Sequence, residues 1–401
     1  MLERKILFRI YFICNTIAAL SFMYSGFVGG DLLGYKMDYP IMMLCSLFIA
    51  LFSIYFLPCV MYPFFEKIIK VKKIGTMKNY SILDWFVLIM NCSYGLFALK
   101  YDVGIAGVET NSSVPKIPLY FFILVQPLYF TYIYMAYTSD RKRLFLYINS
   151  SVLVFFSILQ GWLGSLVFVA FIFIIIYKNY IIRNKFKIFS LFVVAILLSP
   201  FLKFFKKVVS AVNISNSGLT YFDAIDSVMD VKNIHSISDL FNTYLLATVE
   251  RFSHVGVIYY GLVDKSISFF MSSNNITPPF AEGWIQNRIY SAFASHDTID
   301  LQLVLARSLE SAFSWRLQTP ISLWMIVDSN IALLVLLYAF ILMAIIVFLS
   351  KLLSNRVVLF SWFPVLTLLL HGWFYSVTLY IQALLVFIFF VSIFRVIKNK
   401  Q

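Results

Sequence analysis

The feature that most constrains this sequence is a succession of apolar runs, each long enough to cross a lipid bilayer. A transmembrane helix needs about 20 predominantly apolar residues to span roughly 30 Å of hydrocarbon. Hydrophobic residues make up 61% of the 401 residues and charged residues only 13%; a soluble globular protein is about half apolar and a quarter charged. Long runs, rather than alternating strands of about ten residues, argue against a β-barrel. The predicted fold class is therefore an all-α polytopic membrane protein.

Ten membrane spans are predicted from these runs and from the breaks within them. Leu144–Tyr177 would make one helix about 51 Å long, which is far more than a bilayer requires. Gly161–Ser165 divides this run, so we expect two short spans joined by a tight hairpin. The ten predicted spans are Ile6–Val28, Pro40–Phe65, Ser81–Leu99, Ile117–Tyr137, the two halves of Leu144–Tyr177, Ile188–Phe205, Ser329–Ser350, Val357–His371 and Tyr375–Phe394. The first run lacks a small-residue cleavage site, so we expect a retained helix rather than a signal peptide.

The distribution of basic residues predicts the orientation of these spans. The short segments on one side carry twenty Lys and Arg residues, and those on the other side carry three: Lys36, Lys100 and Lys116. Basic loops stay in the cytoplasm, so both termini are expected there and residues 206–328 on the opposite side. In a bacterium this is a multi-pass protein of the inner membrane. The net charge of +13 is then a topology signal and does not indicate a nucleic-acid partner.

The spans predict three parts of the chain. Residues 1–205 hold spans one to seven, residues 206–328 form a large and mostly helical periplasmic loop, and residues 329–401 hold spans eight to ten and a cytoplasmic tail. Within the loop, Leu240–Leu262 is almost apolar enough to cross the membrane. A crossing there would place every later basic segment outside, so we expect a helix that lies on the membrane face or dips in and back.

The large loop also holds the candidate site residues. Ser238–Leu262 has a helical pattern that contains Glu250, Arg251 and His254, and charged groups inside an apolar helix are costly unless they are paired or used. Glu250 and His254 are four residues apart, which predicts that they share a helix face.

Two further segments of the loop carry polar groups. Pro278–Arg288 is predicted to be a turn, and it includes Glu282 and Arg288. A third helix is predicted from about Thr298 to Gln318, capped by Asp297, with Arg307, Glu310 and Arg316 along it.

Arginine binds phosphate through a planar fork of donors, and carboxylates or histidine deprotonate hydroxyl groups. Structural roles compete with these: Arg307 and Glu310 are spaced for a helix-surface ion pair, and His371 is placed to cap the ninth span. The sequence has no phosphate-binding glycine loop, no DxD pair and no metal-ligand spacing. Neither a cofactor nor a metal is therefore expected, and nucleotide-driven transport or nucleotide-sugar chemistry is disfavoured.

The architecture of the whole chain, with many spans and one large outer loop late in the sequence, resembles the bacterial O-antigen polymerases (Wzy). The segment Arg251–Tyr259 (RFSHVGVIY) is similar to the start of a helix in the large loop of such proteins. Gly283 and Arg288 are similar to a second family motif, although Asn287 stands where that motif has proline.

This resemblance implies that repeat units carried on undecaprenyl pyrophosphate are polymerised into O-antigen at the periplasmic face, without nucleotide or metal. It implies that Arg251 and Arg288 bind pyrophosphate, with Arg307 and Arg316 as further candidates. Glu250, His254 or Glu282 would activate the acceptor hydroxyl. Membrane lipid, a chain-length regulator and a flippase are the expected partners. An O-antigen ligase, which uses the same donor, and a flippase for the lipid-linked unit are the alternatives.

Overall fold

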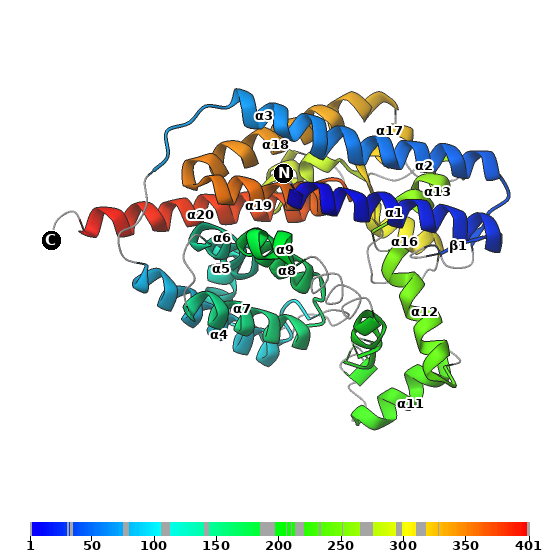
Figure 1. Cartoon of the computed structure of the whole chain (residues 1–401), viewed down its shortest axis with the longest axis horizontal. Helices are drawn as coiled ribbons and strands as arrows, with labels where there is room; N and C mark the ends of the chain where they lie inside the picture. The colour runs from blue at the N-terminus through cyan, green and yellow to red at the C-terminus, as the bar shows by residue number, and fades with distance from the viewer. Residues whose placement is uncertain are drawn as a thin grey trace. The chain divides into compact units, whose positions relative to one another are not determined.

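The protein is an all-α polytopic membrane protein, as the apolar runs predict. A computed structural model describes residues 2–29, 32, 35–74, 80–105, 113–139, 144–184, 197–205, 207–209, 211–212, 220–231, 234–250, 252–264, 276–293, 299–309, 318–327 and 329–398. The described part is predominantly helical (Figure 1). Two very short sheets accompany the helices. Strand β1 (Phe27–Val28) pairs antiparallel with β2 (Tyr35–Lys36), and β3 (Ile276–Thr277) pairs parallel with β4 (Ile299–Asp300).

Six helices of the described part are long and apolar enough to cross a membrane. They are Arg4–Ser25, Pro40–Ile68, Ser81–Tyr101, Lys116–Thr138, Ile331–Leu353 and Phe374–Phe394. Three shorter apolar helices cover Leu144–Leu159, Gly164–Ile176 and Asn355–Leu369, so the predicted breaks near Gly161 and Gly372 are confirmed. The first half of the predicted span Ile188–Phe205 lies outside the described residues. The total of ten spans remains a prediction.

The chain divides into two compact units, each built from separate stretches of sequence. Unit 1 comprises Met1–Lys72, Val249–Lys351 and Ser361–Ile381, and unit 2 comprises Lys73–Thr248, Leu352–Phe360 and Gln382–Gln401. Unit 1 contains α1 (Leu2–Ser25), α2 (Pro40–Tyr55), the π-helix η2 (Phe56–Met61), α3 (Tyr62–Ile68), α13 (Val255–Val263), the 3₁₀ helix η3 (Pro279–Ala281), α15 (Trp284–Phe293), α16 (Leu301–Leu309), α17 (Ile321–Val327), most of α18 (Ser329–Leu353) and the π-helix η4 (Val365–Leu369). Unit 2 contains α4 (Ser81–Tyr101), α5 (Lys116–Val125), α6 (Pro127–Thr138), α7 (Leu144–Leu159), α8 (Gly164–Ile176), α9 (Lys178–Arg183) and α11 (Tyr221–Val231). Helices α12 (Ile237–Glu250), α19 (Asn355–Pro364) and α20 (Phe374–Lys398) contribute residues to both units.

In unit 1, helices α1 and α2 pack side by side, and α13 packs against α1, α2 and α17 (Figure 1). Every residue from Val255 to Tyr260 of α13 is buried. Helix α2 continues into α3 through the wider turns of η2, which contains Pro58. Proline lacks an N–H group and cannot continue a regular helical hydrogen-bond pattern, so the π-helix occurs where the sequence interrupts that pattern.

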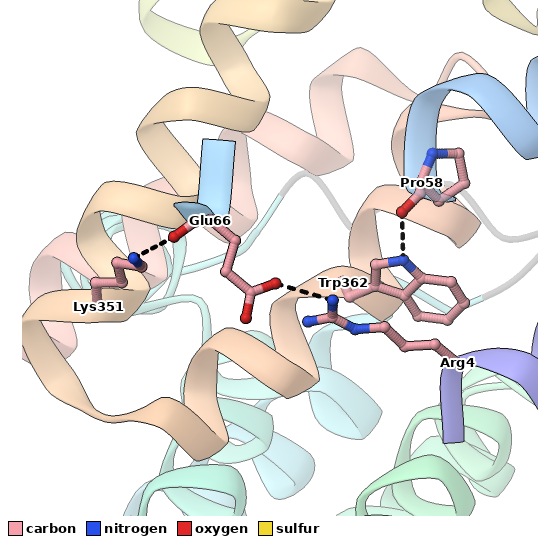
Figure 2. Close-up of polar contacts among 5 residues, drawn as sticks. All are labelled: Arg4, Pro58, Glu66, Lys351 and Trp362. Atoms are coloured by element: carbon pink, nitrogen blue, oxygen red, sulfur yellow. Dashed lines mark hydrogen bonds and ion pairs between the residues drawn. The ribbon is translucent and has the colours of Figure 1, made fainter. Parts of the chain in front are cut away.

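A set of polar contacts lies where the first turn of α1 meets α3 and the last turn of α18 (Figure 2). The indole Nε1 of Trp362 donates to the carbonyl oxygen of Pro58 at 2.7 Å. The guanidinium of Arg4 forms an ion pair with Glu66 at 2.9 Å and lies over the Trp362 ring. The Lys351 ammonium donates to the backbone carbonyl of Glu66. These contacts join α1, η2, α3, α18 and α19 through groups that apolar packing alone would leave unpaired.

Replacing Trp362 with Phe is expected to lower the free energy of unfolding by about 1–3 kcal/mol, because the fully buried indole would no longer satisfy the Pro58 carbonyl. Thermal unfolding in detergent micelles measures the loss. Trp85→Phe is the matched control: Trp85 is half exposed, and its replacement should change stability by no more than about 0.5 kcal/mol. Equal shifts for the two variants would contradict the assigned hydrogen bond.

Unit 2 contains a buried polar network between α4, α6 and α7. The hydroxyl of Tyr134 donates to the carboxylate of Asp84 at 2.7 Å, and the hydroxyl of Thr131 donates to Asn91 Oδ1 at 2.9 Å. Asn149 Nδ2 donates to the backbone carbonyl of Asp84 at 3.2 Å. All five residues are buried. Polar groups in hydrocarbon require partners from neighbouring helices, so this network specifies which helices pack together.

The predicted span Ile117–Tyr137 is present, but its helix is broken in the middle. Gln126 adopts a left-handed conformation with φ 54°, and Pro127 begins α6. The break leaves backbone carbonyls without helical partners, and the side chain of Gln382 donates to two of them, Ile123 at 2.7 Å and Leu124 at 2.8 Å. The span prediction did not include this break, which occurs where the proline has no N–H to donate within the run.

Three predictions for the long loop are also corrected. The predicted helix Ser238–Leu262 is two helices, α12 and α13, separated at residues 252–254. The predicted turn at 278–288 ends early, because α15 begins at Trp284 and places Arg288 on a helix. The predicted third helix begins at Leu301 rather than Thr298, because residues 299–300 pair with β3 instead. Its predicted cap Asp297 and its residue Glu310 lie outside the described residues.

Candidate functional site

Three aromatic side chains from distant parts of the sequence meet in the interior of unit 1. The rings of His254 and His371 are perpendicular, with their centroids 4.1 Å apart. The hydroxyl of Tyr11 lies 3.1 Å from His371 Nε2 and is hydrogen-bonded to it. Each side chain is at most 2% exposed. Tyr11, His254 and His371 are called the histidine cluster below.

A turn that requires glycine places His371 in this cluster. Gly372 has φ +73°, and a Cβ atom there would lie 1.6 Å from the carbonyl oxygen of Thr319. The backbone N–H of Thr319 donates to the carbonyl of His371 at 3.2 Å. The chain therefore turns sharply between η4 and α20, and the residue before the turn points its imidazole toward His254.

His254 directly precedes α13 and is a neutral base. Its side chain is 1% exposed, and burial disfavours the charged form of an imidazole. Its Nε2 atom is buried and has no hydrogen-bond partner among the described residues. A buried polar atom without a partner is costly, and a neutral imidazole in this state is suited to accept a proton from a hydroxyl group that reaches it.

Glu250 lies at the end of α12, close to the backbone that carries the histidine. Its carboxylate packs against Gly29 so closely that a Cβ on that glycine would lie 2.0 Å from Glu250 Oε1. The backbone N–H of Ser253 donates to the Glu250 carbonyl at 2.9 Å. The sequence predicted that Glu250 and His254 share a helix face. This prediction was wrong, because α12 ends at Glu250 and α13 begins only at Val255. Both side chains are nevertheless buried.

Glu282 is connected through Gln302 to the turn that holds His371. Gln302 Nε2 lies 3.5 Å from Glu282 Oε2 and also donates to the carbonyl of Gly372 at 3.2 Å. Gly372 follows His371, so one glutamine side chain connects this carboxylate to the turn that holds the histidine. Glu282 is 7% exposed, which places all three predicted acid–base candidates in the buried part of unit 1.

The predicted pyrophosphate-binding arginines are only partly described. Arg288 is exposed on α15, and no hydrogen bond or ion pair joins its guanidinium to another described residue. Arg307 lies on α16, but its side chain is not described, and Arg251 and Arg316 lie outside the described residues. Their proposed role stays a prediction. Within the described ranges, no three His, Cys, Asp or Glu side chains gather as a metal ion would require.

Three residues of this site were not identified from the sequence: Tyr11, which belongs to the histidine cluster, and Asn15 and Gln302, which lie next to it. The available signal was Asn15, an amide in the middle of an apolar run, where a polar group needs a partner. No sequence pattern connects Tyr11 with His371, which lies 360 residues away.

Comparisons with known proteins do not identify the chain. No family model, curated protein or solved structure matches it. Any functional assignment therefore rests on the chemistry of the site and on the resemblance described above.

The burial of the His254 imidazole predicts that the protein loses stability in mild acid. The unfolded chain binds a proton on this imidazole at about pH 6.5, whereas burial opposes protonation in the folded chain, so acidification below that pH favours unfolding. Among the described residues, the titratable side chains whose rings contact the His254 ring are Tyr11 and His371. The melting temperature in detergent should fall between pH 7.5 and 5, and His254→Gln should reduce this slope.

His235 provides the control for this pH series. It is exposed in the segment before α12, and His235→Gln should leave the slope of the wild-type protein unchanged. A slope that is the same with and without His254 would show that its imidazole is not held neutral by the fold.

Proposed function

We propose that the protein polymerises oligosaccharide repeat units carried on undecaprenyl pyrophosphate into O-antigen polysaccharide, at the periplasmic face of the bacterial inner membrane. The single observation that carries the proposal is the buried, neutral imidazole of His254, whose Nε2 has no hydrogen-bond partner among the described residues. A multi-pass helical architecture supports it, because a lipid-linked substrate reaches its enzyme within the membrane. The resemblance at Arg251–Tyr259 includes this same histidine.

In the proposed reaction, a hydroxyl oxygen of the incoming repeat unit attacks the anomeric carbon of the growing glycan. A new glycosidic C–O bond forms, and the bond from that carbon to the pyrophosphate oxygen breaks. The hydroxyl proton passes to His254, and undecaprenyl pyrophosphate leaves with the electron pair. Glu250 and Glu282 are the alternative proton acceptors.

Arginine side chains are proposed to stabilise the leaving pyrophosphate. Guanidinium groups bind phosphate oxygens through paired N–H donors and neutralise charge as it develops. Arg251 precedes residues 252–254 directly in sequence, and Arg288 is exposed on α15 of the same unit. Arg307 and Arg316 are further candidates. No step of this reaction requires a nucleotide or a metal ion.

A flippase for the lipid-linked unit is the second candidate, and one observation favours it. The span Lys116–Thr138 is broken at Gln126, and interrupted helices near the middle of a span are common in transporters. An O-antigen ligase shares the donor with the polymerase and differs only in the acceptor, so the same residues would serve it.

Gel electrophoresis of lipopolysaccharide from a strain that lacks this gene tests the proposal. A band of lipid A core with one repeat unit, and no ladder, supports the polymerase. Loss of all repeat units points to a ligase or flippase, which the membrane face holding the accumulated lipid-linked units then distinguishes. An unchanged ladder contradicts all three functions. Complementation with the wild-type gene is the control, and a chain-length regulator or flippase from the same strain is the expected partner.

A further inference from the structure

The amide of Asn15 lies at the centre of a hydrogen-bond arrangement that the proposed reaction does not use. Asn15 is fully buried and lies near the middle of the candidate span Arg4–Ser25. Its Nδ2 donates to the carbonyls of Tyr11 at 2.8 Å and Phe252 at 3.1 Å. Its Oδ1 accepts from the backbone N–H of His254 at 2.9 Å and from the hydroxyl of Ser253 at 3.4 Å.

This arrangement explains why α12 and α13 are separate helices. The side chain of Asn15 pairs with one carbonyl and one N–H of residues 252–254, much as a neighbouring strand would. A continuous helix would use these backbone groups internally, so the helix ends and α13 begins again at Val255. The amide satisfies polar backbone that would otherwise be unpaired inside the protein.

The position of α13 shows how far this segment reaches along the candidate spans. The residues just before α13 lie beside Asn15, and the backbone N–H of Tyr39, immediately before α2, donates at 3.2 Å to the hydroxyl of Tyr259 in the middle of α13. Tyr35 donates to Asp264 at 3.4 Å. Nine helical residues are about 13 Å long, roughly half of a hydrocarbon core. Residues 252–263 therefore extend from the N-terminal end of α2 to the middle of α1.

We propose that Asn15 is a positioning residue: its amide holds residues 252–254 beside the middle of α1 and thereby fixes the His254 imidazole against His371. The segment is then re-entrant, and Asn15 sets the depth at which it stops. The catalytic consequence rests on the proposed function, because a base must be held within hydrogen-bond reach of the acceptor hydroxyl. The position of residues 252–254 beside α1 does not depend on that function.

Histidine titration tests the positional claim without any enzyme assay. The full-length chain, labelled with ¹⁵N-histidine and purified in nanodiscs, contains four histidines, and His254→Gln identifies the signal of interest. In the wild-type protein this imidazole should stay neutral down to pH 5. In Asn15→Leu, which removes all four hydrogen bonds, it should become accessible and titrate at least one pH unit higher.

Thr16→Val is the matched control, because within the described part of the chain the Thr16 hydroxyl bonds only the carbonyl of Phe12 in its own helix. It should leave the His254 titration unchanged. If Asn15→Leu does not yield folded protein, Asn15→Ser carries the same test with a smaller loss of hydrogen bonds. A folded Asn15 variant with the wild-type titration would overturn the inference.

A polymerisation assay with the lipid-linked repeat unit separates this inference from the proposed function. Loss of at least tenfold in rate for Asn15→Leu, together with the altered titration, supports both. An altered titration in a protein that polymerises nothing, even in its wild-type form, supports the position of Asn15 and rejects the function. An unaltered titration in an active polymerase supports the proposed function and rejects the role of Asn15.

Discussion

Replacing Gly372 with Ala is expected to leave very little folded protein in the membrane. The left-handed backbone at this position, with φ +73°, costs a residue other than glycine about 1–3 kcal/mol. The added Cβ would also lie 1.6 Å from the carbonyl oxygen of Thr319, a backbone atom that cannot rotate away. The turn would have to open, which would separate Thr319 from His371. The combined loss should exceed about 4 kcal/mol, a large part of the stability of an ordinary protein.

Gly26→Ala is the matched control for this effect. Gly26 has nearly the same backbone conformation, with φ +72°, but a Cβ there meets nothing within 4 Å. Only the torsional cost applies, so this variant should remain largely folded. The yield of monodisperse protein from fluorescence-detected size-exclusion chromatography measures both variants. Equal yields would show that the contact between Gly372 and Thr319 is not as close as described.

Replacing His254 with Gln is expected to reduce the lipopolysaccharide ladder to core with a single repeat unit. Glutamine fills much of the same space but accepts no proton from the acceptor hydroxyl, and general-base catalysis contributes about 10²–10⁴-fold to a rate. The gel pattern of cells that carry the variant in place of the wild-type gene is the measurement.

His235→Gln controls for the loss of a histidine as such, since His235 is exposed and outside the cluster. It should give the wild-type ladder. Membrane levels of both variants must match that of the wild-type protein. A full-length ladder with His254→Gln would reject this residue as the base and leave Glu250 and Glu282 as candidates.

Much of the helical architecture was predictable because hydrocarbon imposes a simple rule. Only helices and closed barrels satisfy their backbone inside a bilayer, so apolar runs identify helices directly. Glycines at 161 and 372 were correctly interpreted as breaks. The break at Gln126 was missed although Pro127 carried the signal, because hydropathy averaged over the run conceals a single proline.

The site was less predictable, because its geometry depends on contacts between distant residues. His254 was identified as a candidate from the cost of a polar group in an apolar segment, and that argument concerns one segment alone. Its pairing with His371 depends on how α1, α13 and the turn at Gly372 pack, which no local pattern encodes. The backbone N–H of His254, just after the helix break, donates to Asn15, 239 residues earlier in the chain.

The polar network of unit 2 has a consequence for how the chain is inserted during synthesis. Asp84 on α4 is made 50 residues before its partner Tyr134 and 65 residues before Asn149. At about 5–20 residues per second, the carboxylate waits several seconds before either arrives. Asn91, in the middle of the same span, likewise precedes its partner Thr131 by 40 residues, and lipid does not solvate its amide in the meantime. The polar face of α4 is therefore complete only once α6 and α7 have been made and packed against it.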